Sequence, residues 1–182
     1  MFVDADSELK ISQQGPGLVS TTLQHDGALT VEGLLTIDAS QVPFDSNARF
    51  IADEIVLTGN LDLSSSANFE LVSREGSITV DGSVVVSNGD LTITSAEHIN
   101  ITGLLSVSDS SVSIYAETDT NLGSSVFSNS TVDIVTLSHL NVSDDLTFGG
   151  TTTASIKANS MNVASDMTLQ DSAVIELGAL DG

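Results

Sequence analysis

The sequence of 182 residues contains no cysteine, no tryptophan, one tyrosine, two prolines and four basic residues. Without cysteine, the chain cannot form disulfides, use a thiol as a nucleophile or bind zinc through thiolates. No apolar run approaches the roughly 20 residues that a membrane-spanning helix needs, so we expect no membrane insertion. A disordered chain is excluded because 40% of the residues are hydrophobic, with many Val, Ile and Leu.

The scarcity of basic residues makes the chain strongly acidic. Asp and Glu number 25, and the formal net charge is -21. The basic residues Lys10, Arg49, Arg74 and Lys157 are dispersed along the sequence. Nucleic-acid binding is therefore not expected, since it requires clustered Lys and Arg. Much of the polar character of the chain comes instead from uncharged residues, namely 28 serines and 18 threonines.

An internal repeat of about 21 residues dominates the sequence. Apolar-x-apolar triplets, the period-2 pattern of β-strands, recur in three sets. From residue 55 onward, the second and third sets both advance by 23, 21, 21, 20 and 21 residues. The first set is Phe69/Leu71, Leu91/Ile93, Val112/Ile114, Val132/Ile134, Ala154/Ile156 and Ile175/Leu177. The second set is Leu29/Val31, Ile55/Leu57, Ile78/Val80, Ile99/Ile101, Thr120/Leu122, Leu140/Val142 and Met161/Val163, and the third is Leu35/Ile37, Leu61/Leu63, Val84/Val86, Leu105/Val107, Val126/Ser128, Leu146/Phe148 and Met167/Leu169.

This repeat predicts an all-β fold, a single parallel β-solenoid (β-helix) with about seven three-strand turns of roughly 21 residues. Each strand would pair in parallel with its copies one turn away, and the apolar triplets would stack into a continuous core. Turn-forming residues mark the expected corners, such as Gly82 and Gly103 after the second set and Asn88 and Asn129 after the third. A β-sandwich is the main alternative, but it would not produce a near-constant period.

The solenoid is expected over residues 27–182. Residues 1–26 fit the repeat poorly and contain Gly15-Pro16-Gly17, so we expect an N-terminal capping or strand-donating segment there. Because the core triplets are uncharged and Ser and Thr occupy the corners, we expect the Asp and Glu residues on the outer walls and in the N-terminal segment.

Two stretches of the repeat resemble a known family. Ser77–Ile93 (SITVDGSVVVSNGDLTI) and Ile99–Val107 (INITGLLSV) resemble the filamentous haemagglutinin type of parallel β-helix found in large bacterial adhesins. The resemblance is one of pattern and composition and covers about residues 27–182. It implies a secreted or cell-surface stalk, adhesin or fibre without catalytic activity. Bactofilin-type β-helices, which polymerise through their end turns, are a weaker match because their turns are shorter.

Asparagines occupy the outward position at the centre of the second set in four successive turns: Asn100, Asn121, Asn141 and Asn162. Side-chain amides about 4.8 Å apart can form a hydrogen-bonded ladder along the axis, or can serve as a recognition strip for glycans. Asn100, Asn129 and Asn141 also begin Asn-x-Ser/Thr sequences, so they are candidates for N-glycosylation.

Two further columns carry titratable groups. His98, Asp119 and His139 fall on successive turns, and we interpret them as a surface charge column because the two histidines are too far apart to share a metal. Asp144, Asp145 and Asp166 meet at one corner. Calcium prefers clustered oxygen ligands, so these three residues are calcium candidates and calcium is the one cofactor considered. A solvated acidic edge is the alternative.

Enzymatic activity is not predicted. No nucleophile elbow, P-loop or zinc-binding helix sequence occurs. Carbohydrate-active β-helices require carboxylates and a basic residue in one groove, whereas the basic residues here are scattered.

The functional prediction is based on the apolar residues at the ends of the solenoid. Ile175 and Leu177 begin a further turn, but no segment is expected to cover Met161, Val163, Met167 and Leu169. Two explanations are open. Either the chain is a fragment of a longer solenoid, or another copy of the chain covers this end, with Phe2, Val3, Leu9 and Ile11 supplying strands.

The sequence therefore predicts a non-catalytic extracellular structural protein that assembles head-to-tail with copies of itself into a filament or surface layer. Two alternatives remain open at this point. One is an adhesin stalk fragment that binds glycans, and the other is a polysaccharide-active β-helix enzyme.

Overall fold

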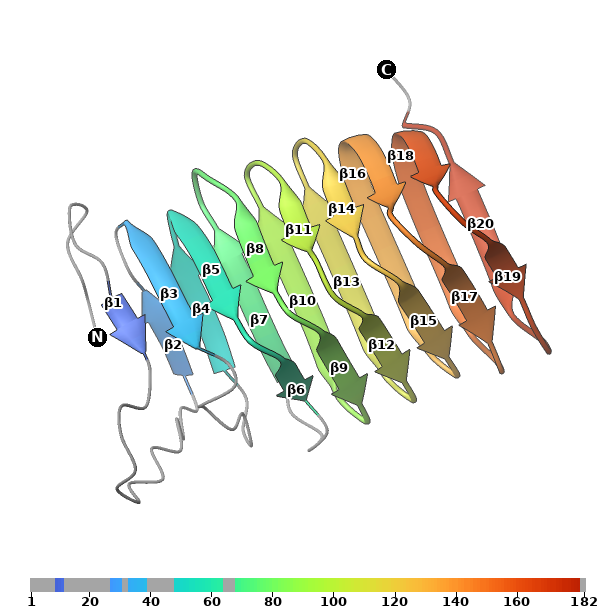
Figure 1. The fold of residues 1–182 in the computed structure, drawn as a ribbon, viewed down its shortest axis with the longest axis horizontal. Helices are drawn as coiled ribbons and strands as arrows, with labels where there is room; N and C mark the ends of the chain where they lie inside the picture. Colours follow the sequence, from blue (N-terminus) through green and yellow to red (C-terminus); the bar gives the residue numbers. More distant parts are fainter. Residues whose placement is uncertain (1–8, 12–26, 31–32, 39–47, 64–67, 181–182) are drawn as a thin grey trace.

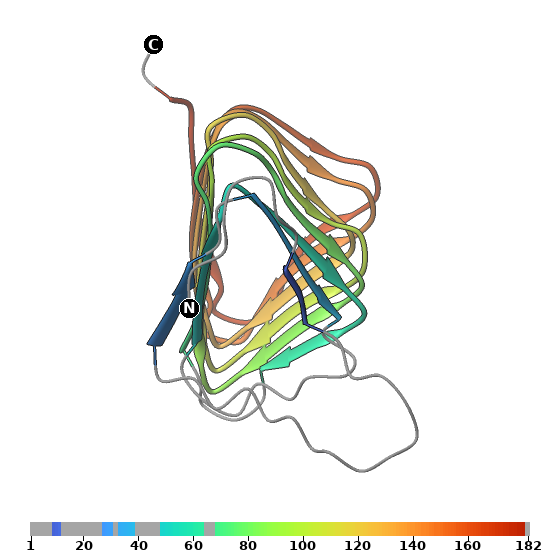
Figure 2. The same cartoon turned by 90° about the vertical axis from the view of Figure 1, so that its left-hand side faces the viewer.

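The computed structural model describes residues 9–11, 27–30, 33–38, 48–63 and 68–180. These residues form strands β1 to β20, connected by turns, and contain no helix. Successive turns of the chain stack along the long axis of the molecule (Figure 1). Seen from one end, the stack has a roughly triangular outline (Figure 2). The predicted parallel β-solenoid is confirmed.

The triangle has three faces, and every strand pair on them is parallel. Face 1 contains β2 (Gly27–Thr30), β4 (Ala48–Ala52), β7 (Asn68–Ser73), β10 (Asp90–Ser95), β13 (Ser111–Ala116), the first halves of β16 (Thr131–Val142) and β18 (Thr153–Val163), and β20 (Val174–Gly178). Face 2 contains β1 (Leu9–Ile11), β3 (Leu34–Asp38), β5 (Glu54–Thr58), β8 (Ile78–Asp81), β11 (Ile99–Ile101), β14 (Thr120–Leu122), and the second halves of β16 and β18. Face 3 contains β6 (Leu61–Leu63), β9 (Val84–Ser87), β12 (Leu105–Ser108), β15 (Ser125–Ser128), β17 (Leu146–Gly149) and β19 (Met167–Leu169).

Faces 1 and 2 form one continuous sheet because β16 and β18 bend around the corner between them, where the register shifts between Thr136 and His139. Face 3 is a separate six-stranded sheet, so the described residues complete about six turns rather than seven. The predicted repeat length is confirmed by the registers, in which Leu91 pairs with Val112 and Ile78 with Ile99.

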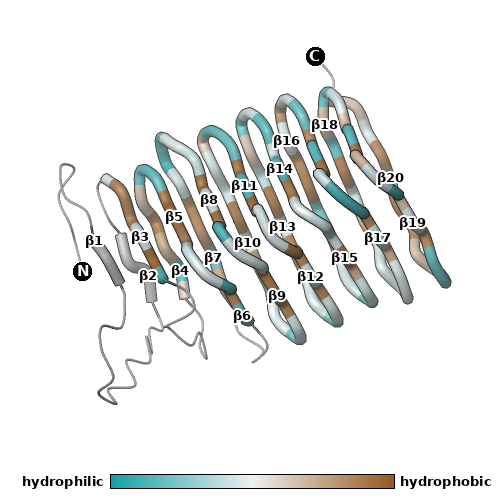
Figure 3. Tube along the Cα trace, in the orientation of Figure 1, coloured by the Kyte–Doolittle hydropathy of each residue, from teal (hydrophilic) through white to brown (hydrophobic). Residues whose placement is uncertain are grey.

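The core is a column of apolar side chains that runs along the axis. On face 2, Ile55, Ile78 and Ile99 stack in consecutive turns, and each is fully buried. Phe127 stacks on Phe148 with ring centroids 5.3 Å apart. In Figure 3, hydrophobic segments recur along the strands and hydrophilic segments recur at the turns, as a stack of identical turns requires.

The face assignment of the first turns was wrong in the sequence-based prediction. Leu35 and Ile37 pair with Ile55 and Leu57 and so lie on face 2, not face 3. Leu29 pairs with Phe50 on face 1, not face 2. The connection from β2 to β3 is about as short as the connection from β5 to β6, so the spacing of the triplets does not distinguish the two corners. Val31 lies outside the described residues.

One triplet of face 3 was predicted out of register. Ser125 and Phe127 point into the core and are fully buried, whereas the predicted Val126 and Ser128 face outward. The corner before β15 is one residue shorter than in the preceding turn, and Gly123 stacks directly against the carbonyl oxygen of Gly103. A shift of one residue exchanges the two sides of a strand, because side chains alternate.

Among the described residues, acidic side chains lie both on the outer walls, as predicted for Asp62, Glu70 and Asp133, and at the corners, which were not predicted to hold them. Asp53, Glu75, Glu97, Glu117 and Asp119 all lie between strands of face 1 and strands of face 2. Asp144, Asp145 and Asp166 lie at the corner between faces 2 and 3, and Asp109 and Asp171 lie between faces 3 and 1. Parallel strands stack identical positions about 4.8 Å apart, so charges are tolerated best where the corners expose them fully to water.

Ion pairs connect the early turns. Arg74 Nη2 lies 2.6 Å from Asp53 Oδ1, and Asp53 Oδ2 accepts a 2.7 Å hydrogen bond from the backbone N of Gly33. Asp53 thereby links three consecutive turns at one corner. Arg49 Nε lies 2.8 Å from Glu70 Oε2 in the next turn of face 1. Two of the four basic residues thus cross-link neighbouring turns.

Two buried threonines of the core differ in how their hydroxyls are satisfied. Thr136 Oγ1 donates to the carbonyl oxygen of Thr118. Thr120 takes the place of an aliphatic residue between Ile99 and Leu140, and its Oγ1 has no hydrogen-bond partner. Both side chains are fully buried.

We therefore expect Thr120→Val to stabilise the protein and Thr136→Val to destabilise it. Valine has nearly the shape of threonine, so each variant mainly tests the hydroxyl. Removal of the unsatisfied hydroxyl of Thr120 should raise the free energy of unfolding by about 1 kcal/mol, and loss of the Thr136 bond should lower it by about 1–3 kcal/mol. Thermal and urea unfolding measure both changes. Equal effects of the two substitutions would contradict the assignment.

Candidate functional surfaces

The corner between faces 3 and 1 is built by a column of left-handed residues. Asn88, Asp109, Asn129, Gly150 and Asp171 have φ values of 58°, 51°, 51°, 63° and 59°. Asn and Asp tolerate this conformation better than other residues with a side chain, and glycine adopts it freely. The prediction that these corners contain residues with positive φ is confirmed.

A ladder of hydroxyls satisfies the backbone at this corner. Ser110 Oγ accepts a 3.2 Å bond from the backbone N of Gly89 in the previous turn, and donates to the carbonyl oxygen of Ser108 at 2.6 Å. Ser130 Oγ accepts from the backbone N of Ser110 at 3.4 Å and donates to the Ser128 carbonyl at 2.7 Å.

The next turn repeats the arrangement with threonine in place of serine. Thr152 Oγ1 accepts from the backbone N of Ser130 at 3.3 Å and donates to the Gly149 carbonyl at 2.7 Å. The left-handed residue interrupts the normal strand ladder, and each hydroxyl replaces a carbonyl acceptor that the adjacent turn would otherwise supply. We name Ser110, Ser130 and Thr152 the hydroxyl ladder.

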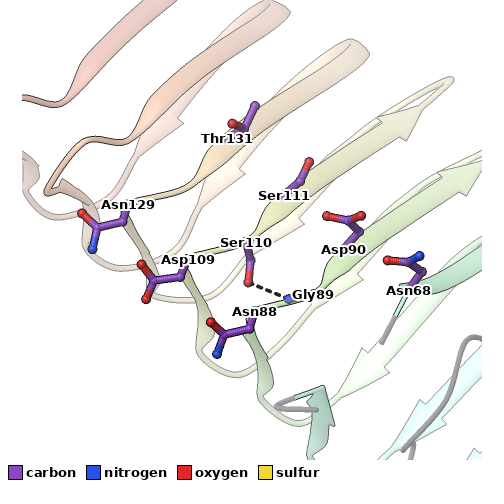
Figure 4. Close-up of a pocket in the computed structure, with 9 residues that line it drawn as sticks. All are labelled: Asn68, Asn88, Gly89, Asp90, Asp109, Ser110, Ser111, Asn129 and Thr131. Atoms are coloured by element: carbon purple, nitrogen blue, oxygen red, sulfur yellow. Dashed lines mark hydrogen bonds between the residues drawn. The ribbon is translucent and has the colours of Figure 1, made fainter. Parts of the chain in front are cut away.

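A polar groove of about 370 Å³ runs along this corner. In Figure 4, Asn88, Asp109 and Asn129 line one side, and the strand-start residues Asn68, Asp90, Ser111 and Thr131 line the other. Its lining offers amides, hydroxyls and carboxylates, without an aromatic or basic side chain among the described residues. This chemistry suits hydrogen bonding to polar groups.

The predicted asparagine ladder on face 2 is confirmed over three turns. Asn121 Nδ2 donates to Asn100 Oδ1 at 2.7 Å, and Asn141 Nδ2 donates to Asn121 Oδ1 at 3.0 Å. Asn162 pairs in register with Asn141 on the next strand. A second groove, of about 470 Å³, lies beside the ladder and is lined by Thr79, Asn100, Ile101, Thr102, Asn121, Leu122, Asn141 and Ser143.

The three glycosylation candidates lie in two environments. Asn100 and Asn141 belong to the asparagine ladder, and the Nδ2 of Asn141 already donates a hydrogen bond within it. Asn129 is exposed at the corner, where its Oδ1 accepts a 3.2 Å bond from the backbone N of Thr151. A glycan on Asn129 would leave the ladder intact. Modification of any of the three stays a prediction.

In the column of His98, Asp119 and His139, the structure brings His139 and Asp119 into contact. His139 Nδ1 lies 2.8 Å from Asp119 Oδ1, and the same oxygen accepts a 3.1 Å bond from the backbone N of His139. The side-chain hydrogen bond with His139 is the main cause that holds the pKa of the Asp119 carboxyl below its ordinary value. His98 Nδ1 instead contacts Thr118 Oγ1 at 2.7 Å.

At the proposed calcium corner, the structure brings two of the three carboxylates into neighbouring turns. Asp145 Oδ1 accepts a 3.2 Å bond from the backbone N of Asp166. A hydrogen bond from the Ser165 side chain, followed by that backbone bond, lowers the pKa of the Asp145 carboxyl. Across the described part of the chain, no group of three His, Cys, Asp or Glu side chains is placed to hold a metal ion. Calcium binding by Asp144, Asp145 and Asp166 stays a prediction.

The residues predicted for assembly lie at the two ends of the solenoid. Leu9 and Ile11 are on β1, the outermost strand of face 2, and pair with Leu35 and Ile37. Ile175 and Leu177 are on β20, the outermost strand of face 1. Phe2 and Val3 lie outside the described residues.

The C-terminal end of the solenoid exposes apolar side chains. Leu169, Val174 and Leu177 are 53%, 62% and 57% exposed, and Met167 is also exposed. Val174 was not predicted as part of this surface. Its neighbour in the repeat, Thr153, is polar, so the pattern gave no signal for it.

No helix in the described residues is long and apolar enough to cross a membrane. No protein-family model, curated protein or solved structure matches the chain.

Substitution Ser130→Ala tests the hydroxyl ladder. Ser130 is buried, and its loss would leave the backbone N–H of Ser110 without its acceptor, so we expect the free energy of unfolding to fall by about 1–3 kcal/mol. Ser106→Ala, at an outward position in the middle of face 3, is the control and should change it by less than about 0.5 kcal/mol. Urea unfolding compares the two. Similar losses in both variants would contradict a special role for the ladder.

The Asp119–His139 contact predicts a pH dependence. Because the folded-state pKa of Asp119 is lowered, its contribution to stability is present above the unfolded-state pKa of about 3.9 and is lost as the pH falls through the folded value. We expect Asp119→Asn to lower the melting temperature slightly at pH 6 and to have no effect near pH 2. The double variant with His139→Ala should lose less than the sum of the two single variants, because both substitutions remove the side-chain contact between Asp119 and His139. A difference from the wild type that persists unchanged at pH 2 would refute this assignment.

Proposed function

We propose that this chain is a non-catalytic structural protein of the cell exterior, and that its solenoid assembles end to end with further copies into a filament or surface layer. The observation that carries the proposal is the exposed apolar surface at the C-terminal end, formed by Met167, Leu169, Val174 and Leu177. Clustered exposed apolar side chains on an otherwise polar molecule indicate an interaction surface.

The chemistry of the ends favours strand pairing as the mode of contact. Edge strands carry unpaired backbone N–H and C=O groups that can pair with another chain. β1 and β20 are the outermost strands of faces 2 and 1 in the described part of the chain. Stacking another solenoid on such an end would continue both the hydrogen-bond ladders and the apolar core. An open head-to-tail contact of this kind generates a fibre.

The charge of the chain favours association along the axis over association through the sides. The described acidic residues lie at the corners and on the outer walls of the triangle, along the length of the rod. Two rods with a net charge of -21 therefore repel each other side by side at low ionic strength. Contact through the ends keeps most of these corners apart.

The polar surfaces support a structural role over a catalytic one. Arg49 and Arg74 are engaged in ion pairs between turns. The two grooves on the described residues contain hydrogen-bonding groups in repeating rows, a geometry suited to binding or stabilisation. An external location agrees with the Ser- and Thr-rich composition and with the resemblance to adhesin-type β-helices.

Binding of neutral glycans is a second candidate function, favoured by the asparagine ladder. Each bridging amide uses one N–H and one oxygen lone pair along the axis, which leaves a further donor and acceptor for a ligand. The adjacent groove of about 470 Å³ has no charged side chain in its lining. Binding of neutral glycans by a protein that stays monomeric would favour this function over assembly.

Electron microscopy and sedimentation of the purified protein test the assembly proposal, with Leu177→Lys as the disruptive variant. A lysine on β20 would place a charge in the apolar contact, and we expect the concentration needed for assembly to rise by at least about tenfold. The matched control is Leu104→Lys, because Leu104 is also exposed (38%) but lies at a lateral corner. The control should still form uniform filaments one solenoid wide.

A wild-type protein that stays monomeric at every concentration and salt condition would overturn the proposal. Equal loss of assembly in both lysine variants would also oppose a contact through the C-terminal end.

A further inference from the structure

The groove beside the asparagine ladder lies where one turn of the solenoid is shorter than its neighbours. The corner that follows β14 contains only Gly123 and Ser124, whereas the corners of the turns before and after it span residues 102–104 and 143–145. The short corner comes directly after Asn121, which bonds to an asparagine on each side and is the middle member of the ladder. The irregular turn and the centre of the ladder therefore coincide.

The short corner removes a side chain from the column next to the ladder. The backbone N of Gly123 donates to the carbonyl oxygen of Ile101 at 2.8 Å, which places Gly123 beside Thr102 of the previous turn. Ser143 occupies the same place in the next turn, and Thr102 and Ser143 are both exposed. A Cβ atom on Gly123 would overlap the carbonyl oxygen of Gly103, so this position excludes any side chain.

The groove of about 470 Å³ extends along this gap. The asparagine ladder lines one side of it, and Thr102 and Ser143 line the other side. Clefts that bind small molecules have volumes of roughly 300–1,000 Å³, so the groove is large enough for a ligand and not only for water.

The lining offers hydrogen-bonding groups that the fold does not use. The amide of Asn121 keeps one N–H and one oxygen lone pair after both ladder bonds are made. The hydroxyl of Thr102 donates to Asp81 Oδ1 at 3.2 Å, which leaves its oxygen as an acceptor. The exposed hydroxyl of Ser143 can both donate and accept. Donors and acceptors thus face each other across the gap, as a ligand rich in hydroxyls requires.

The charges around the groove favour a neutral ligand. None of the lining residues is charged, so a cation finds no carboxylate in the groove, and the net charge of -21 repels an anion. The lining contains no aromatic ring on which a nucleobase could stack. Thr79 and Thr102 each add a methyl group to their hydroxyl, which matches the mixture of C–H and hydroxyl groups on a sugar ring.

We propose that a linear neutral glycan binds along the axis of the solenoid, with one sugar ring seated in the gap at Gly123 between Asn121 and the hydroxyls of Thr102 and Ser143. This inference rests on the second candidate function, glycan binding, and does not depend on end-to-end assembly. Asn100 and Asn141 repeat the amide of Asn121 at intervals of about 4.8 Å along the axis. Neighbouring sugars of a chain that runs parallel to the axis therefore meet the same chemistry in the adjacent turns.

Calorimetric titration of the purified protein with defined oligosaccharides tests the ligand class. The neutral probes are β-1,4-linked hexasaccharides of glucose, N-acetylglucosamine and mannose, and the anionic counterpart of the last is the β-1,4-linked hexasaccharide of mannuronic acid. We expect at least one neutral probe to bind. The mannuronic acid probe should bind at least about tenfold more weakly than that probe, because its carboxylates meet an acidic protein. The corresponding monosaccharide should also bind at least about tenfold more weakly, because it reaches one turn only.

Two variants test the position of the site. Ser143→Leu fills the gap beside Gly123 and leaves the asparagine ladder intact, and we expect the affinity for the hexasaccharide to fall at least about tenfold. The matched control is Ser113→Leu, at an outward position of face 1, which should change the affinity by less than about twofold. Asn121→Ala removes the central amide and should also lower the affinity at least about tenfold. Its melting temperature is measured alongside, and Ser143→Leu decides the question if Asn121→Ala does not fold.

The outcomes separate this site from the wider proposals. Hexasaccharide binding that Ser143→Leu and Ser113→Leu leave equally unchanged would overturn the site and leave glycan binding standing. Equal affinity for the monosaccharide and the hexasaccharide would overturn the alignment of the ligand along the axis. No binding of any neutral probe would overturn both the site and the glycan-binding candidate, and side-by-side pairing of copies lost only in Ser143→Leu would then assign the groove to a second copy. Filaments seen by electron microscopy in either case would leave end-to-end assembly standing.

Discussion

Every described strand of this protein pairs in parallel with the strand one turn away, and this in-register contact constrains the rest of the structure. It places equivalent positions about 4.8 Å apart, so each column must hold side chains that tolerate close copies of themselves. Aliphatic residues satisfy this condition inside, as in the column of Ile55, Ile78 and Ile99. Asparagine satisfies it on the surface, because Asn100, Asn121 and Asn141 bond to one another through their amides.

The same constraint explains the corners and the ends. Where a left-handed residue such as Asn129 interrupts the strand ladder, the hydroxyl of a neighbouring turn supplies the missing acceptor, and the interruption repeats at the same place in each turn. Carboxylates lie at the corners and at outward positions of the strands, such as Asp62 and Asp133, where water screens them. At the ends of the stack, the outermost strands have a neighbouring strand on one side only among the described residues.

The repeat length, the parallel pairing and most of the core could be predicted from the sequence, because each turn repeats the apolar pattern of the turn before it. The errors fell where that repetition weakens. Leu35 was placed on the wrong face because two corners have similar lengths, and Phe127 was missed because the short corner at Gly123 shifts the alternation by one residue. Of the candidate surfaces, the asparagine ladder was predicted correctly from its column, whereas the hydroxyl ladder was missed because a corner hydroxyl looks the same in sequence whether it faces water or a backbone N–H.

The sequence by itself therefore determined the architecture and the scarcity of positive charge, since both depend on composition and on a period that can be counted. Only the tertiary structure decided which hydroxyls are satisfied, where the acidic residues lie and on which face each end stops. These properties depend on the exact number of residues at each corner, because one residue more or less turns a side chain from the core to the solvent.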